Sequence, residues 1–507
     1  MTQRSSNAPT GDDLAYRSAT DLAASLRAGE VSAVEALDSA LARVERHNPE
    51  LNVVVTLDAE RALAAAVEVD RRRTAGDDDE LGPLAGVPIT IKDSLMVAGT
   101  RTTSGAPELS DFVAEVDAAS VAALKAAGAI VYGKTNLPKY AGDLQSFNDV
   151  FGTSNNPWDI TRTTGGSSGG SAGSLAAGFT SLEIGSDIAG SIRNPAAMCG
   201  VVGHKPSYGI VSGRGQIPGP PGTLTQADIA VIGPMARTVA DCRLGLELMG
   251  GPDDWHRHAW SLSLPPPRAG VVDADGRTTV DPARLRVAIM ATDPYCPVDP
   301  EIEAAILAVG ERLAAAGATV DTDVRPEDFD FEKADRAFLT LLGGAMCGGY
   351  SRTEIEEMAE RLAAAGGQPL PGDLGIEGAT IRHREWLTAN ERRLQMRDRW
   401  RRFFDDWDIV LAPISPTVAI PHDHTSPMSS RLIDVAGQTR PYTDQMRWMG
   451  LFGVVWLPAT AVPIGQHSSG LPMALQAVGP FLEDLTCLGV AEWIEANGGG
   501  FVRPPGF

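Results

Sequence analysis

A run of glycine and serine in the middle of the 507-residue chain most constrains its fold. Residues 161–174 read TRTTGGSSGGSAGS, and the apolar sequence LAAGFTSLEIGSD follows at once. A flexible linker would be followed by the start of a new patterned segment. Because apolar sequence follows here, the run predicts a loop wedged between buried elements rather than a spacer.

Two nucleotide-binding patterns fail on this run. A P-loop requires lysine and then serine or threonine after its second glycine, but Ser171 and Ala172 stand at those places. A dinucleotide-binding fingerprint requires GxGxxG at the start of a helix that follows a strand, and the run does not provide it. A hydrolytic serine is the third reading of the run.

A serine nucleophile needs a base that takes its proton. Of the eight histidines only His204 lies near the run in sequence, and no GxSxG elbow stands in good context, so a Ser-His-Asp triad is unsupported. Lysine is the other base, provided that it is neutral. Lys92 lies near the end of the β-rich segment GVPITIKD. The sequence leaves open whether its amine extends to the surface or acts in a site. His422 and His424 lack a third ligand, so no metal site is predicted.

Composition narrows the setting of the protein. The chain has 43 Lys and Arg against 65 Asp and Glu, a formal net charge of −22, which repels nucleic acid and anionic membranes. Five cysteines without a CxxC pair favour a reducing compartment. The first residues show no apolar signal region and no stretch reaches membrane-spanning length. We therefore expect a cytoplasmic protein.

Strand-like and helical patterns alternate along most of the chain. The pattern predicts an α/β fold, with a mixed central β-sheet covered by helices on both faces. Residues 1–80 are expected to form an N-terminal helical segment, in which Ser32 and Glu35 form a capping box and Asn48-Pro49 ends a helix. This segment is expected to pack on residues 81–507, which form one domain with a surface loop at about 264–284. Expected strands and helices later in the chain are the strands 86–93, 129–133, 285–290 and 408–413, and the helices 121–127 and 301–316.

Three motifs in order identify a family. GVPITIKD, then GGSSGGSAGSLAAG, then SDIAGSIRNPAAMCGVVGHKPSYG together resemble the amidase signature family. GKTNLP, NPWD, GPMARTVAD, LPATAVPIG and GLPMALQAVGP match as well, so the likeness spans roughly residues 15–495. The fold that it implies is the amidase signature fold.

The resemblance also implies a Ser–cis-Ser–Lys triad. Its lysine falls on Lys92, its bridging serine on Ser167 and its nucleophile on Ser191, the serine of GSIR. It further implies a cis peptide bond between Gly166 and Ser167. Neighbouring glycines make such a bend sterically accessible, and this accounts for the glycine-rich run.

Backbone and side-chain roles around the nucleophile follow from the same resemblance. Asp187, Arg193 and Gly166 are expected to support the site. The amides expected to form an oxyanion hole belong to Ile188, Ala189, Gly190 and Ser191. Two positions depart from the family pattern: Ala189 replaces a glycine, and Lys139 replaces the glutamate of the common EFA sequence.

The expected activity is acyl-enzyme hydrolysis of amide C–N bonds, without cofactor or metal. The sequence resembles stand-alone bacterial aryl acylamidases, nylon-oligomer hydrolases and urethanases, which implies aryl or bulky apolar amides and carbamates as substrates. The side chains expected to bind such substrates are Tyr140, Trp448, Phe452 and Trp456, although the last three also suit a core helix. The expected partners are a small-molecule substrate, with no nucleic acid and no membrane, and a monomer or homodimer. The alternative function is the amidase subunit of a tRNA-dependent amidotransferase.

Overall fold

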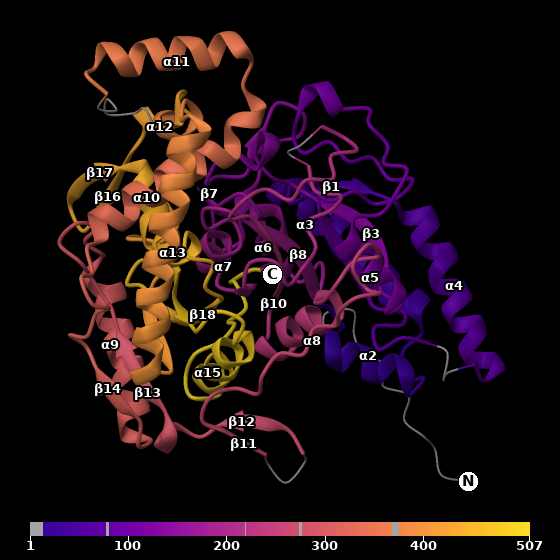
Figure 1. The fold of residues 1–507 in the computed structure, drawn as a ribbon. Coiled ribbons are helices and arrows are strands. Elements are labelled where there is room, and N and C mark those ends of the chain that lie inside the picture. The colour runs from indigo at the N-terminus through magenta and orange to yellow at the C-terminus, as the bar shows by residue number, and fades with distance from the viewer. Residues whose placement is uncertain (1–13, 78–80, 218–219, 273–275, 368–374) are drawn as a thin grey trace.

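A mixed eight-stranded sheet forms the centre of the molecule (Figure 1). The computed structural model describes residues 14–77, 81–217, 220–272, 276–367 and 375–507. The sheet confirms the predicted fold class: one strand is parallel to both of its neighbours, and the other neighbours are antiparallel. In spatial order its strands are β14 (Thr319–Asp321), β13 (Arg286–Ile289), β15 (Ile409–Pro413), β19 (Pro472–Val478), β18 (Ala459–Gln466), β9 (Val202–Lys205), β10 (Val231–Ala236) and β8 (Leu182–Asp187).

A second sheet of three strands lies beside strand β8 of the first. Its strands, in spatial order, are β1 (Val54–Leu57), β3 (Ile130–Thr135) and β2 (Pro88–Lys92). Strand β1 comes from the N-terminal segment expected to be helical, and it pairs antiparallel with β3. The remaining strands form two-stranded ribbons: β4 (Phe147–Asn148) with β5 (Gly152–Thr153), β6 (Asn155–Asn156) with β7 (Asp159–Thr163), β11 (Gly270–Val272) with β12 (Thr278–Val280), and β16 (Leu432–Val435) with β17 (Gln438–Pro441).

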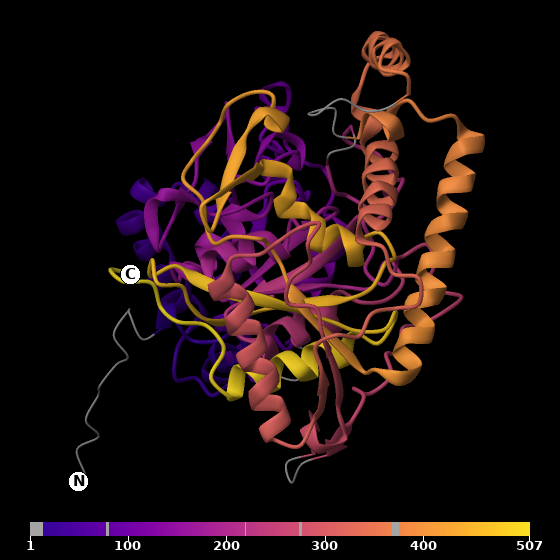
Figure 2. The ribbon, with the colours of Figure 1, turned by 90° about the vertical axis from the view of Figure 1, so that its left-hand side faces the viewer.

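Helices flank the main sheet. Figure 1 shows the indigo and purple N-terminal helices at one side of the molecule and the orange helices at the other, and the turned view in Figure 2 keeps the two groups apart. The helices are α2 (Ala19–Arg27), α3 (Ala33–Leu51), α4 (Ala59–Ala75), α5 (Ala119–Ala126), α6 (Gly169–Ala176), α7 (Arg193–Cys199), α8 (Val239–Met249), α9 (Pro300–Ala315), α10 (Phe331–Met346), α11 (Arg352–Ala364), α12 (Ile376–Ala379), α13 (His383–Asp406), α14 (Arg447–Gly453) and α15 (Asp484–Ala496). Among the described helices, none is long and apolar enough to cross a membrane.

The first long helix confirms one predicted boundary and corrects another. Ser32 and Glu35 form the predicted capping box at the start of α3. The helix does not stop at Asn48-Pro49 but continues through Pro49 to Leu51. The helix ends two residues after Pro49, where the next residue, Asn52, adopts the left-handed conformation, with φ 49°.

Tight packing explains the glycine and serine run. All eight residues of α6 are buried. A Cβ on Gly170 would lie 2.3 Å from the backbone nitrogen of Asn136, and one on Gly173 would lie 2.6 Å from a methyl carbon of Val53. Contacts of this length exclude any side chain. The run is therefore glycine-rich because α6 passes directly against the backbone that follows β3.

Adding one methyl group to α6 tests this packing. We expect Gly170→Ala to lower the free energy of unfolding by about 2–3 kcal/mol, because a rigid backbone atom occupies the space for the new carbon. Gly348→Ala is the matched control, since no atom lies within 4 Å of its added Cβ and its φ is not positive. Urea denaturation of both variants measures the difference. Equal stability of the two variants would contradict the packing argument.

Candidate active site

Strand β2 ends in a lysine that has no exposed surface. The Lys92 Nζ atom donates hydrogen bonds to the hydroxyls of Ser167 at 2.7 Å, Ser168 at 2.8 Å and Ser186 at 3.0 Å. Burial lowers the pKa of Lys92 to about 7, against the opposing pull of Asp187 and of Glu183. A large fraction of the amine is thus neutral near pH 7, as a general base must be.

The turn before α6 presents Ser167 to this amine. The Gly166–Ser167 peptide bond is cis, the isomer that the family resemblance implies. The Ser146 hydroxyl holds the turn, because it donates to the carbonyl of Gly165 at 3.0 Å and accepts the amide proton of Gly169 at 3.0 Å. A Cβ on Gly166 would lie 2.6 Å from the carbonyl oxygen of Asp143, so this position admits only glycine.

Ser191 lies on the loop between β8 and α7. Its carbonyl accepts a hydrogen bond from the amide of Ser168 at 3.1 Å, which joins the loop to the turn that carries Ser167. Ser191 is 5% exposed, whereas Lys92 and Ser167 are fully buried. Of the three residues of the predicted triad, Ser191 is therefore the only one that retains exposed surface.

A buried ion pair braces the same loop. Asp187 accepts hydrogen bonds from the Arg193 side chain, at 3.0 Å for both Nε and Nη2, and from the amide of Gly190 at 2.8 Å. Burial alone would raise the pKa of Asp187, but the Arg193 guanidinium outweighs it and lowers the pKa to about 2. Arg193 also donates to the carbonyl of Met449 at 3.0 Å and to Gln476 at 2.9 Å. The pair thus fixes the loop to α14 and β19.

Glycine is required at the tip of this loop for two reasons. Gly190 has φ 108°, a conformation that favours glycine, and a Cβ there would lie 2.1 Å from the sulfur of Met449. Its amide is engaged by Asp187, so it does not join the predicted oxyanion hole in this arrangement. Within the described residues, no hydrogen bond occupies the amides of Ile188, Ala189 or Ser191, and φ of Ala189 is not positive.

Sequence reasoning missed several residues of this site. Ser168 and Ser186 complete the shell of the lysine amine, and Met449 closes the space behind Gly190. Ser168 stands inside the GGSSGG motif and could have been found there. Ser186 opens the motif SDIAGSIRN and could have been found there as well. The contact of Met449 with Gly190 could not, because it depends on how α14 approaches the site.

The four predicted substrate-binding side chains are not gathered at the triad. Trp448 and Phe452 have no exposed surface; Trp448 packs edge-on against Phe331 and Phe452 against Trp400. Their packing is that of a core helix, the alternative reading of this segment.

The other two predicted side chains lie in separate clusters. The Trp456 ring stacks on Tyr208 at 5.0 Å between ring centroids. The Tyr140 hydroxyl donates to Glu108 at 3.0 Å. The Tyr140 ring packs against a small apolar cluster that includes Met96 and Ile217.

Three histidines considered as bases or metal ligands make other contacts in the described part of the chain. His204 is fully buried between Thr460 and Asp484, with ring nitrogens 2.9 and 3.2 Å from their oxygens. His422 and His424 lie side by side on a loop, where His424 stacks on Phe147. No group of three or more potential metal ligands occurs among the described residues.

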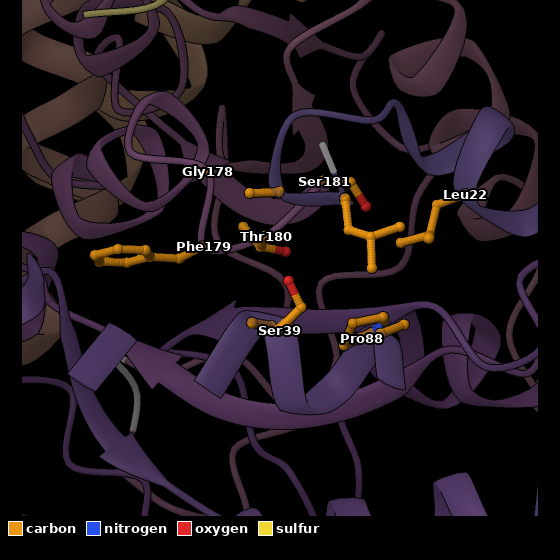
Figure 3. A pocket seen from close by; sticks show the side chains of 11 residues that line it. Leu22, Ser39, Pro88, Gly178, Phe179, Thr180 and Ser181 are labelled. Atoms are coloured by element: carbon orange, nitrogen blue, oxygen red, sulfur yellow. The ribbon is translucent and has the colours of Figure 1, made fainter. Parts of the chain in front are cut away.

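A small hollow lies between α2, α3 and the turn 178–181 (Figure 3). Pro88, Leu22 and Ser39 line it. Pro88 begins β2 and Lys92 ends it, so this hollow opens at the far end of the strand from the candidate site.

Comparisons with known proteins show the family of the chain. A family model described as Amidase matches residues 35–488. A glutamyl-tRNA(Gln) amidotransferase subunit from Roseiflexus sp. (strain RS-1) is 33% identical over 490 residues, which cover 93% of this chain and 94% of that protein. The corresponding subunit from Symbiobacterium thermophilum is 34% identical over 485 residues, 92% and 93% of the two chains. Among solved structures, 6-aminohexanoate cyclic dimer hydrolase superposes with a TM-score of 0.75 at 26% identity and covers 97% of this chain and 99% of its own.

The names of these relatives contradict the prediction of a monomer or homodimer without a nucleic-acid partner. Each name describes one subunit of an enzyme of glutamyl-tRNA. The prediction rested on the net charge of −22. A net charge is a sum over the whole surface and does not reveal which face a partner covers.

Removing the lysine amine tests its burial. The folded chain has Lys92 with a pKa of about 7, and a free lysine has about 10.4. Between these values the unfolded chain binds more protons, so Lys92 makes the free energy of unfolding rise with pH. We expect the free energy of unfolding of Lys92→Met to exceed that of wild type by the most at and below pH 7. This difference should shrink as the pH rises to about 10.

Urea denaturation across that pH range measures the effect. Lys125→Met is the control, because the Lys125 side chain is partly exposed and pairs with Asp117 at the surface. A difference between Lys92→Met and wild type that does not change with pH would rule out a buried, neutral amine.

Proposed function

Because the chain belongs to the amidase signature family, we propose that it cleaves an amide C–N bond through an acyl-enzyme on Ser191, as the amidase subunit of an amidotransferase. The observation that carries the chemistry is the buried Lys92 amine, 2.7 Å from the Ser167 hydroxyl. The relatives named as glutamyl-tRNA(Gln) amidotransferase subunits, which match over more than nine tenths of both chains, support the assignment to an assembly.

The first half of the reaction forms the acyl-enzyme. Neutral Lys92 takes the proton of the Ser167 hydroxyl while Ser167 takes that of Ser191, and Ser191 Oγ bonds to the amide carbon. The free amides of Ile188, Ala189 and Ser191 are the donors that would hold the resulting oxyanion, each worth about 3 kcal/mol in comparable hydrolases. The proton then returns through Ser167 to the nitrogen, the C–N bond breaks, and the amine leaves.

The second half restores the enzyme. A water molecule loses a proton to the same relay and attacks the acyl carbon. The bond to Ser191 Oγ breaks, the relay returns its proton to Ser191 Oγ through Ser167, and the carboxylic acid leaves. Asp187 and Arg193 serve both halves by holding the loop in one shape. Removing one partner of such a buried ion pair lowers the free energy of unfolding by about 3–5 kcal/mol. Gly166 serves by letting the backbone of Asp143 approach the cis turn.

In an amidotransferase the useful product is the released nitrogen. A primary carboxamide is the substrate class that yields ammonia, and a second protein chain would receive it and carry the tRNA chemistry. This role gives the chain a partner protein and places a charged tRNA in the assembly, as the names of the relatives state for those proteins.

A second candidate function is hydrolysis of a bulky apolar amide or carbamate by the same triad. Its support is a structural relative rather than a pocket at the triad. The solved structure with 26% identity is named as a hydrolase of 6-aminohexanoate cyclic dimer, a cyclic amide. The burial of Trp448 and Phe452 removes the aromatic wall that first suggested this substrate class.

Exchange of the nucleophile tests the mechanism. We expect Ser191→Ala to lose at least about 1,000-fold in kcat with an unchanged melting temperature, because no other hydroxyl takes its place. Ser174→Ala is the matched control: Ser174 is a buried serine of the glycine-rich helix α6, and its hydroxyl has no partner within the described structure. More than a few per cent of wild-type activity in Ser191→Ala would refute the assignment.

The two candidate functions differ in substrate and in assembly. For the amidotransferase role we expect protein isolated from its own cells to contain a second chain in stoichiometric amount. We also expect kcat/KM for L-glutamine to exceed that for an anilide or an aryl carbamate. Light scattering and peptide identification test the first point, and initial rates test the second. A particle made only of 53.4 kDa chains that prefers the anilide or the carbamate would favour the second candidate.

A further inference from the structure

One carboxyl group near the triad is buried without a cation of its own. Glu183 lies in β8 and has no exposed surface. Its Oε1 accepts a hydrogen bond from the Thr90 hydroxyl at 2.6 Å, and its Oε2 accepts one from the amide of Ile184 at 3.0 Å. The Thr135 and Ser171 hydroxyls also hydrogen-bond to this carboxyl. These donors satisfy its polar atoms but do not neutralise a negative charge.

Neighbouring buried carboxylates are paired differently. Asp93 lies 3.1 Å from the ammonium of Lys134, and Asp187 lies 3.0 Å from the guanidinium of Arg193. Within the described part of the chain, no ion pair includes Glu183. A buried charge without a partner is costly, so such a group takes up a proton or depends on a cation nearby.

Lys92 is the cation placed to respond to Glu183. Thr90, which bonds the carboxyl, and Lys92 stand two residues apart in β2 and so share one face of the strand. Ser186, three residues after Glu183 in β8, accepts a hydrogen bond from the Lys92 amine. The same short stretches of β2 and β8 therefore carry both groups.

We propose that the charge of Glu183 sets the proton affinity of the Lys92 amine: the ionised carboxylate stabilises the ammonium form, and a protonated carboxyl does not. Glu183 is thus a positioning residue that acts through the base, and the inference rests on the proposed function of Lys92. It adds a residue that sets the pH at which the base becomes neutral.

The two groups titrate in the same range. Burial raises the pKa of Glu183 to about 7 and lowers that of Lys92 to about 7, so the charge of each group changes in the pH range in which the other titrates. Asp187 also attracts the proton of Lys92, but its pKa of about 2 keeps it ionised at every working pH. Its effect on the amine is therefore constant.

The remaining charged or titratable groups around the pair are held by other partners. Lys134 bonds to Asp93, the Tyr132 hydroxyl donates to the carbonyl of Phe179, and Lys205 donates to the carbonyls of Pro206 and Leu457. Glu183 is therefore the remaining neighbour of the Lys92 amine that changes its charge near neutral pH.

Glu183→Gln removes the negative charge and keeps the shape. Without that charge the protonated amine is less stable, so we expect the pKa of Lys92 to fall by about one unit. The rising limb of the kcat/KM profile against pH should move down by the same amount. A purely structural role of Glu183 would lower activity without moving this limb.

Direct titration of the amine tests the proposal without any substrate. The chain contains only six lysines, Lys92, Lys125, Lys134, Lys139, Lys205 and Lys333, so Cε signals of carbon-13-labelled lysine can be assigned one by one. Glu495→Gln is the matched control: burial raises the pKa of Glu495 to about 7 as well, but it lies on α15 and bonds to the amide of Val239. We expect its effect on Lys92 to stay below about 0.3 unit.

A second variant guards against misfolding of the first. Thr90→Val removes the hydrogen bond that favours the ionised carboxyl, so it raises the pKa of Glu183. The pKa of Lys92 should then fall, as it does in Glu183→Gln. A Lys92 titration that neither variant moves, or that Glu495→Gln moves equally, would overturn the proposal. Absence of amide hydrolysis in wild type would refute the proposed function instead, because the titration does not depend on turnover.

Discussion

A lysine amine with no exposed surface and only hydroxyl groups as hydrogen-bond partners is the constraint on which this site depends. Burial keeps Lys92 out of contact with solvent, so the charged form is disfavoured and the amine becomes a base near neutral pH. Three serines supply its contacts, and the carboxylates of the region are bonded to other groups. The amine can take a proton because no carboxylate binds it directly.

The fold creates this environment where its two sheets meet. Strand β2 of the small sheet brings in the lysine, and β8 at the edge of the main sheet leads into the loop of Ser191. Helix α6 fits between them and the backbone after β3 because its glycines carry no side chains. The glycine and serine run thus allows close packing of β2, β8 and the turn before α6. The serine hydroxyls of the turn and of β8 can then all contact the Lys92 amine of β2.

Much of this could be predicted from the sequence. Short apolar segments predicted β2, β13 and β15, because buried strands consist of such segments. The ordered motifs predicted Lys92, Ser167 and Ser191 as site residues. Contacts made across the fold could not be predicted. Trp448 and Met449 are neighbours in one apolar segment, yet Trp448 faces the core and Met449 faces Gly190. Only the direction in which α14 docks separates them.

The central claim is that Ser191 is the nucleophile and that Lys92 and Ser167 activate it. The most direct measurement is peptide mapping by mass spectrometry after reaction with an alkyl fluorophosphonate, which labels an activated serine covalently. The account predicts one adduct per chain, on the peptide that contains Ser191, and its loss when Lys92 is replaced by methionine. An adduct on Ser167 or Ser168 with Ser191 unmodified, or no adduct on a folded chain, would contradict it.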